Sequence, residues 1–216
     1  MSFTIPEKII PAHTFSGRNV RPMLSPRETK IVSALIKCKA AYRSTLERFW
    51  THPIKGRQKV QALLRWGVLW SYTLGESEIV TLSPLSEKLY SAQAYVPTDP
   101  GDALKTALAS EIYIKALQNG VPCEWEPAGY PLQGVINANG NRAGMLVLFK
   151  DENIYLGVKI RCFVVCEDEE HIRSLSRSVF FPALYATPET LKGDVSEAFC
   201  DGSLRKVKVN MFLARS

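Results

Sequence analysis

The stretch from Arg43 to Leu69, RSTLERFWTHPIKGRQKVQALLRWGVL, constrains the fold more than any other part of the chain. It holds two short helical patterns, and the proline and glycine of His52–Gly56 predict a turn between them. In the second pattern Val60, Leu63 and Leu64 recur at helical spacing and predict one apolar face. We therefore expect two helices that pack through apolar faces and carry their basic side chains outward.

A further helix is predicted directly before this stretch. Ser25-Pro26-Arg27-Glu28 has the residues of a capping box, with a proline suited to the first helical position. Ile31, Ala34, Leu35 and Cys38 then follow at helical spacing. The sequence thus predicts three successive helices.

Strands are predicted after Gly67. Residues 68–74 and 79–82 are apolar and flank the turn-like segment Gly75-Glu76-Ser77-Glu78, which is typical of a hairpin. Ser83-Pro84 then predicts the start of a helix over residues 85–91. The expected order is three helices, a hairpin and a helix.

This order, with these residues, resembles a winged helix-turn-helix domain over about residues 25–92. GRQKVQALLRWGVL is similar to a basic recognition helix that runs into the first strand of the wing, and VTLSPLSEKLY is similar to the segment after the wing. Leu85-Ser86 departs from that pattern, because a glycine is often found there. The resemblance implies double-stranded DNA as a partner.

The charge of the chain is divided unevenly. Residues 1–92 carry 14 lysines and arginines against 6 aspartates and glutamates, whereas residues 93–216 carry 13 against 15. All of the positive excess therefore lies in the first part, which favours a polyanionic partner for that part alone. The alternatives are a basic surface that is merely solvated and a module that binds another protein.

A short helix of this kind fits the major groove, where arginine suits the acceptors of guanine and glutamine suits adenine. On this basis the predicted base-reading residues are Arg57, Gln58 and Gln61. The predicted phosphate-binding residues, which give position and affinity without sequence information, are Arg43, Ser44, Thr45, Arg48, Lys55, Lys59 and Arg65. Glu76 and Glu78 at the predicted wing tip would repel phosphate, so we expect the helix to carry most of the contact.

The predicted fold class is mixed, α+β or α/β, with four parts. These are an irregular N-terminal arm (1–24), the winged helix-turn-helix domain (25–92), a linker QAYVPTDPG (93–101) and a C-terminal α/β domain (102–216). In the last part we expect a helix from Asp102 to Leu117 and a second helix from about Glu167. We expect strands over residues 121–125, 134–137, 145–149, 154–166, 179–186 and 204–213, and a short helix from Thr187.

Helix, three strands, helix and strand is the core order of the restriction-endonuclease-like fold. VVCEDEEHIRSL and FFPALYATPETL are similar to the C-terminal half of the replication-relaxation family, in which a winged helix precedes such a domain in proteins of plasmids and other mobile elements. The resemblance covers about residues 25–190. It implies control of the transcription or replication of such an element.

Nucleases of this fold hold a divalent cation with carboxylates, one of them in a Glu-x-Lys pair on a strand. Lys159 could be that lysine, but Gly157 stands two residues before it, and residues 141–144 supply no carboxylate. We therefore expect no catalytic or metal site, and a nuclease-like domain that serves as a scaffold. The alternatives are a metal-dependent DNA nuclease or nickase and a protein-binding adaptor.

Other chemistry is weakly indicated. His171 is expected on an exposed helix surface, and Cys162 and Cys166 in the core. The five scattered cysteines include no CxxC pair, and no glycine pattern indicates a nucleotide, so we expect no cofactor and no small-molecule ligand. No apolar run approaches the roughly 20 residues of a membrane span. We expect a cytoplasmic protein that gains specificity as a homodimer.

Overall fold

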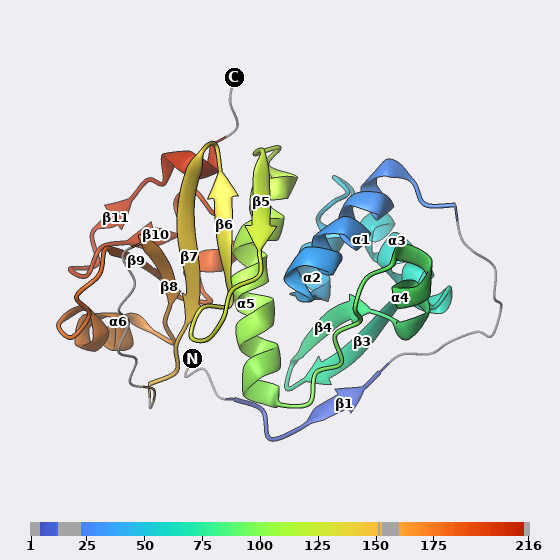
Figure 1. Cartoon of the computed structure of the whole chain (residues 1–216), viewed down its shortest axis with the longest axis horizontal. Helices are drawn as coiled ribbons and strands as arrows, with labels where there is room; N and C mark the ends of the chain where they lie inside the picture. Colours follow the sequence, from blue (N-terminus) through green and yellow to red (C-terminus); the bar gives the residue numbers. More distant parts are fainter. Residues whose placement is uncertain (1–4, 13–22, 151, 153–159, 214–216) are drawn as a thin grey trace. The chain divides into compact units, whose positions relative to one another are not determined.

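The structure is a computed structural model that describes residues 5–12, 23–150, 152 and 160–213 (Figure 1). It is of mixed α+β class, as predicted, and it divides into two compact units. The first unit spans Ile5–Ser110, and the second is built from Glu111–Ser216. Helix α5 (Pro100–Gln118) begins inside the segment expected as a linker and crosses the boundary between the units.

The first helix confirms the predicted capping box. Helix α1 (Pro26–Cys38) begins after Ser25, whose hydroxyl accepts from the Glu28 backbone N–H at 3.5 Å. The Glu28 carboxylate accepts in return from the Ser25 backbone N–H at 2.7 Å. Ile31 and Leu35 are buried on the apolar face that the spacing predicted.

The next segment differs from the prediction at Gly56. Strand β2 (Ala40–Tyr42) leads into the short helix α2 (Arg43–Glu47), and α3 runs from Pro53 to Arg65, so Gly56 lies inside a helix and not in a turn. A Cβ atom on Gly56 would overlap the carbonyl oxygen of Glu47. Glycine is therefore needed here because α2 and α3 approach each other closely.

The predicted hairpin and the helix after it are confirmed. Strands β3 (Leu69–Leu74) and β4 (Ser77–Leu82) pair antiparallel, and α4 (Pro84–Tyr90) follows with Ser83 as its N-cap. Two short strands complete this sheet in the order β1-β3-β4-β2. Strand β1 (Ile9–Pro11) pairs with β3, so the arm that we expected to be irregular contains a strand.

The second unit contains a seven-stranded sheet in the order β11-β10-β9-β8-β7-β6-β5. Strands β7, β8 and β9 are parallel, α6 (Glu169–Ser176) connects β8 to β9, and the other neighbours are antiparallel. The strands are β5 (Cys123–Glu126), β6 (Gly134–Ala138), β7 (Asn141–Val147), β8 (Cys162–Val165), β9 (Ala183–Ala186), β10 (Phe199–Cys200) and β11 (Lys206–Val207).

Three predicted strands of this unit are shorter than expected, and the one expected over residues 179–186 is confirmed only as Ala183–Ala186. Of the strand expected over residues 154–166, only Cys162–Val165 is a strand within the described residues, and 153–159 lie outside them. Of the strand expected over 204–213, only Lys206–Val207 (β11) is a strand. Asp201 accepts from the backbone N–H of Ser203 and Arg205 in the turn between β10 and β11, and the 3-10 helix η2 (Asn210–Phe212) follows β11. A short 3-10 helix, η1 (Thr190–Lys192), confirms the one expected after Thr187.

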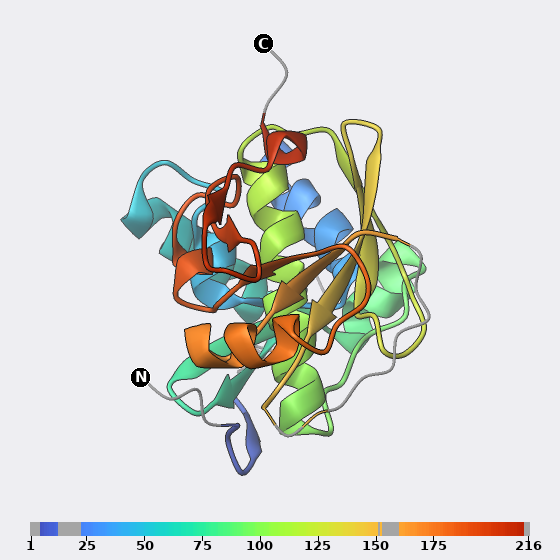
Figure 2. The ribbon, with the colours of Figure 1, turned by 90° about the vertical axis from the view of Figure 1, so that its left-hand side faces the viewer.

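The two faces of this sheet bury different side chains. Helix α6 lies on one side and the second-unit part of α5 on the other (Figure 2). Cys162, Val164 and Cys166 pack toward Ile172 and Leu175 of α6. Phe163, which alternates with them along β8, packs instead against Phe199 at a ring-centroid distance of 4.5 Å.

His171 is buried, which corrects the expectation of an exposed position. Its backbone N–H donates to Asp168, the N-cap of α6, at 2.8 Å, and its Nδ1 accepts from the Glu167 backbone N–H at 3.4 Å. Burial lowers the pKa of His171 from its ordinary value, although nearby carboxylates act in the opposite direction.

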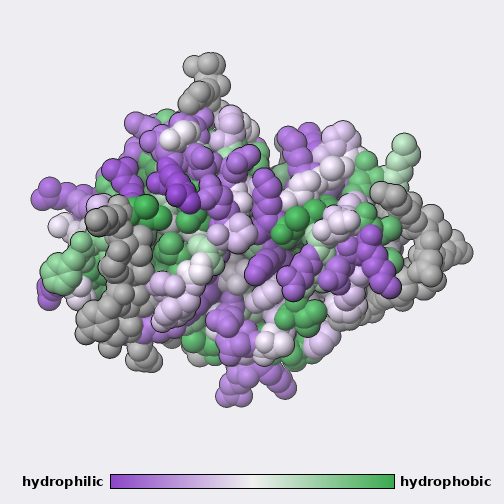
Figure 3. Space-filling model, viewed as in Figure 1, coloured by the Kyte–Doolittle hydropathy of each residue, from purple (hydrophilic) through white to green (hydrophobic). Residues whose placement is uncertain are grey.

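The surface is mainly polar in the view of Figure 3, where hydrophobic side chains show as small, separate groups. Among residues 5–12, 23–150, 152 and 160–213, no helix combines the length and the apolar character that crossing a bilayer requires.

Candidate nucleic-acid interface

Helix α3 turns an apolar side to the core and a basic side outward. Val60, Leu63 and Leu64 are buried, as predicted. On the outward side, Lys55, Arg57, Gln58 and Arg65 are exposed. The other two predicted interface residues of α3, Lys59 and Gln61, are half-buried.

The N-terminus of α3 differs from those of α1 and α4. Ser25 and Ser83 cap α1 and α4 through their hydroxyls, but in the described part of the chain no side chain caps α3. Its first turn, Pro53-Ile54-Lys55-Gly56, contains no carboxylate. Neither a side-chain cap nor an acidic residue of the first turn therefore compensates the first backbone N–H groups and the positive end of the helix dipole, and such a helix start favours an anion.

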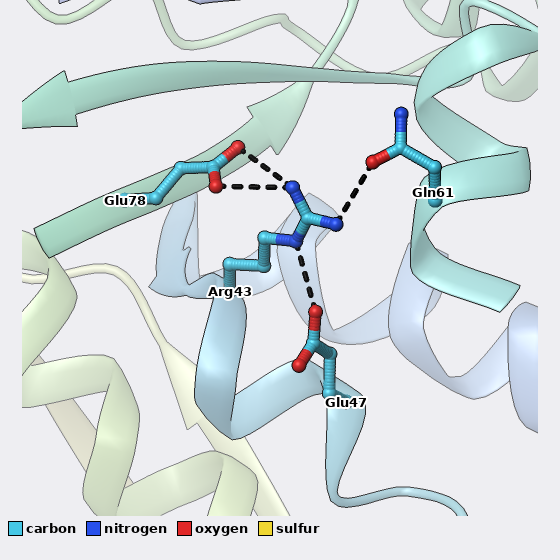
Figure 4. Close-up of polar contacts among 4 residues, drawn as sticks. All are labelled: Arg43, Glu47, Gln61 and Glu78. Atoms are coloured by element: carbon cyan, nitrogen blue, oxygen red, sulfur yellow. Dashed lines mark hydrogen bonds and ion pairs between the residues drawn. The ribbon is translucent and has the colours of Figure 1, made fainter. Parts of the chain in front are cut away.

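Arg43 makes contacts within the first unit that correct its predicted role. Its Nε donates to Glu47 at 2.9 Å, and its Nη1 donates to both carboxylate oxygens of Glu78 at 3.0 and 3.2 Å (Figure 4). Its Nη2 donates to Oε1 of Gln61 at 2.9 Å. The guanidinium thus joins α2, α3 and β4, and it is not presented to a phosphate.

This cluster also changes the expectation for the hairpin. Glu78 was expected to repel phosphate together with Glu76, but its carboxylate is paired with the Arg43 guanidinium. Glu76 alone of these two is exposed, beside Gly75 in the turn. The negative charge expected at the tip is therefore partly neutralised within the unit.

Lys59 is a second predicted phosphate-binding residue with an internal partner. Its Nζ lies 3.2 Å from Oε1 of Glu28, whose side chain is 2% exposed. Burial alone would raise the pKa of Glu28, but its hydrogen bonds with Ser25 and the charge of Lys59 together hold it below the ordinary value. Lys59 therefore connects α3 to the start of α1.

The remaining predicted residues lie on or next to α2. Ser44 is exposed in its first turn, and Arg48 is exposed at its C-terminal end. Thr45 is buried, which does not favour a contact of its hydroxyl with phosphate.

Ile54 is an interface candidate that the sequence did not indicate. It lies in the first turn of α3, directly before Lys55, and 59% of it is exposed. An exposed aliphatic side chain at this place could contact the methyl group of thymine. The sequence does not indicate this, because an isoleucine between Pro53 and Lys55 is equally consistent with a buried position.

The positions where a nuclease of this fold would carry its carboxylates and lysine lie in the second unit. Residues 141–144, expected near one acidic position, lie on β7, where Arg142 pairs with Glu126 at 2.6 Å. Gly157 and Lys159 lie outside the described residues. Within the described residues, no three His, Cys, Asp or Glu side chains are grouped as metal ligands.

Two cysteines of this unit lie in the core, as predicted. Cys162 and Cys166 are buried in the core beneath α6, and burial raises the pKa of the Cys162 thiol to about 11. A thiol that is protonated at neutral pH is a poor nucleophile and a poor metal ligand.

Comparison of the chain with family models, with curated proteins and with solved structures found no match.

Proposed function

We propose that this protein binds double-stranded DNA selectively through α3, without an enzymatic activity of its own. By its resemblance to the replication-relaxation family, we propose that it regulates the transcription or replication of a plasmid or other mobile element. Two copies would double the length of DNA that is read, so the proposal includes a homodimer on a site with two halves.

The outward side of α3 carries this proposal. Lys55, Arg57, Gln58 and Arg65 are exposed on one 13-residue helix that begins without a side-chain cap and without a carboxylate in its first turn. A solvated surface helix gains stability from an acidic first turn or a cap. α3 lacks both, and a phosphate at its N-terminus would supply the missing acceptor.

The element order supports the same proposal. Residues 26–90 form helix, strand, two helices, hairpin and helix, which is compatible with a winged helix-turn-helix domain. In such a domain the N-terminal part of the third helix meets the base edges. The residues there would be Ile54, Arg57 and Gln58, with Lys55 on a phosphate.

The first test is selection of bound sites from a pool of random duplexes, followed by titration of the best site at several salt concentrations. Arg57→Ala should weaken the selected site by about 1–3 kcal/mol and relax the preference at one position. Lys55→Ala should weaken all duplexes alike and reduce the salt slope by about 1.

Lys37→Ala is the matched control, because Lys37 is an exposed lysine in the last turn of α1 and is not on α3. It should leave both the preference and the salt slope close to those of the unaltered protein. Absence of binding to any duplex at low salt would refute the proposal. If the protein binds duplex DNA, recovery of bound genomic fragments tests the proposed link to mobile elements.

A further inference from the structure

The contact between Arg43 and Gln61 fixes which way the Gln61 amide points. A guanidinium has only donors, so the atom that faces Nη2 at 2.9 Å must be the carbonyl oxygen of Gln61. The amide nitrogen Nε2 is therefore on the opposite side of the group, directed away from Arg43 (Figure 4). Gln61 is half-buried, and its carbonyl oxygen is directed to Arg43 while its amide nitrogen points the other way.

The orientation is held from three elements. Glu47 and Glu78 bind the other two nitrogen atoms of Arg43, so the guanidinium cannot turn without losing an ion pair. The side chains of Arg43, Glu47 and Glu78 are 20%, 19% and 31% exposed, and partial burial strengthens these contacts. Rotating the Gln61 amide by half a turn would place its NH₂ group against a cation, which is unfavourable.

We propose that Arg43 sets the base preference of Gln61, which would read guanine and not adenine. This inference rests on the proposed function. Guanine presents two acceptors in the major groove, N7 and O6, whereas adenine presents the N7 acceptor and the N6 donor. The usual pairing of glutamine with adenine needs both the carbonyl oxygen and the amino group of the glutamine directed to the base edge. With that oxygen directed to Arg43, the N6 amino group of adenine would meet a donor.

Arg43 is then a positioning residue that acts through Gln61. Methionine in place of Arg43 keeps an unbranched aliphatic stem and removes all the guanidinium N–H donors. The amide of Gln61 can then turn and offer both a donor and an acceptor. The preferred base at this position should change from guanine to adenine, while the preferences set by Arg57 and Gln58 stay as they were.

The experiment is site selection from a random duplex pool with the unaltered protein, Gln61→Ala and Arg43→Met, with thermal unfolding as the check of folding. The unaltered protein should favour guanine over adenine about tenfold at one position, the lower part of the range for a good base contact. Gln61→Ala should lose the preference at that position alone. Arg43→Met should favour adenine there.

The outcomes separate the two proposals. Duplex binding with adenine preferred at the position that depends on Gln61, or with every preference intact in Gln61→Ala, overturns this inference and leaves the proposed function standing. Absence of duplex binding overturns both. If Arg43→Met does not fold, the comparison of the unaltered protein with Gln61→Ala still decides which base Gln61 reads.

Discussion

Glu28 shows how one buried carboxylate serves two elements. It accepts from the backbone N–H of Ser25 at the start of α1, and its other oxygen faces Lys59 of α3. The pKa of Glu28 is lowered despite burial, so the folded state favours the charged form. A lowered folded-state pKa contributes stability at pH values above the ordinary value of 4.5, and that contribution is lost as the pH falls.

Glu28→Gln tests whether the charge of Glu28 stabilises the folded state. Glutamine can still complete the capping box, so the change removes mainly the charge. We expect a loss of about 1 kcal/mol at pH 7, kept small because Lys59 is 38% exposed. The difference from the unaltered protein should shrink as the pH falls below 4.5, measured by urea unfolding.

The control is Glu87→Gln, which alters an exposed glutamate on α4. Its difference from the unaltered protein should stay small at each pH. A Glu28→Gln protein whose unfolding free energy runs parallel to that of the unaltered protein from pH 7 to pH 3 would contradict the expectation.

Residues with partners close in sequence were the ones that could be predicted. Ser25 and Glu28 are three residues apart, and their capping box was read directly. Arg43 and Glu78 are 35 residues apart, so nothing local indicates that a basic residue of the expected interface is paired internally. The basic composition was informative about the surface of α3, but it overstated how many of these side chains are available for DNA.

At Gly56 a contact between two helices outweighs the local conformational preference of the residue. A glycine in a helix interior costs about 1 kcal/mol relative to alanine, so sequence reasoning placed it in a turn. The backbone of Glu47 lies where a Cβ would be, and this close approach of α2 outweighs the local preference. The hairpin, in contrast, was predictable because its turn, with Gly75 at a φ of 61°, is local.

Gly56→Ala should therefore destabilise the first unit, although alanine is the better helix former. The added methyl group must push α2 and α3 apart, and overpacking of this kind costs about 1–3 kcal/mol. Gln58→Ala, an alanine at an exposed position of the same helix, should change stability by less than about 0.5 kcal/mol. Urea unfolding followed by circular dichroism measures both. A more stable Gly56→Ala protein would contradict the packing argument.

Very short strands were beyond the reach of sequence patterns. Strands β1 and β2 have three residues each, too few to show an alternation. Lys206–Val207 lies in a segment with alternating apolar residues, and the turn at Asp201 brings it opposite β10, but β10 offers only two residues for pairing and the chain then enters the helix η2. Local alternation does not reveal how many residues find a partner strand.

The whole molecule divides inside a helix, which no composition change indicated. The prolines before α5 suggested a boundary near residue 100, but the first unit extends to Ser110. Ala103, Leu104 and Ala107 of α5 are buried, and the Ser110 hydroxyl lies 3.0 Å from the Cys38 carbonyl oxygen at the end of α1 and 2.7 Å from that of Thr106. The first half of α5 therefore belongs to the core of the first unit.

This division predicts how fragments behave. A fragment of residues 1–118 should unfold at a clearly higher urea concentration than one of residues 1–98, because the shorter one exposes the apolar surface that α5 covers. Ser110→Ala in the longer fragment should cost about 1 kcal/mol, since it leaves the Cys38 carbonyl without this donor. Equal unfolding midpoints for the two fragments would show that α5 contributes nothing to this unit.

The pairing of β1 with β3 has a consequence for the order of events during synthesis. Ile9 pairs with Leu74, so the first strand leaves the ribosome well before its partner exists. At about 5–20 residues per second, that wait lasts several seconds. Helices α1, α2 and α3 have all been made by then, and the hairpin partner β4 follows within a few residues. Closure of the β1 edge is therefore a late step, and the nascent chain carries Ile9 and Ile10 unpaired until the helices are already in place.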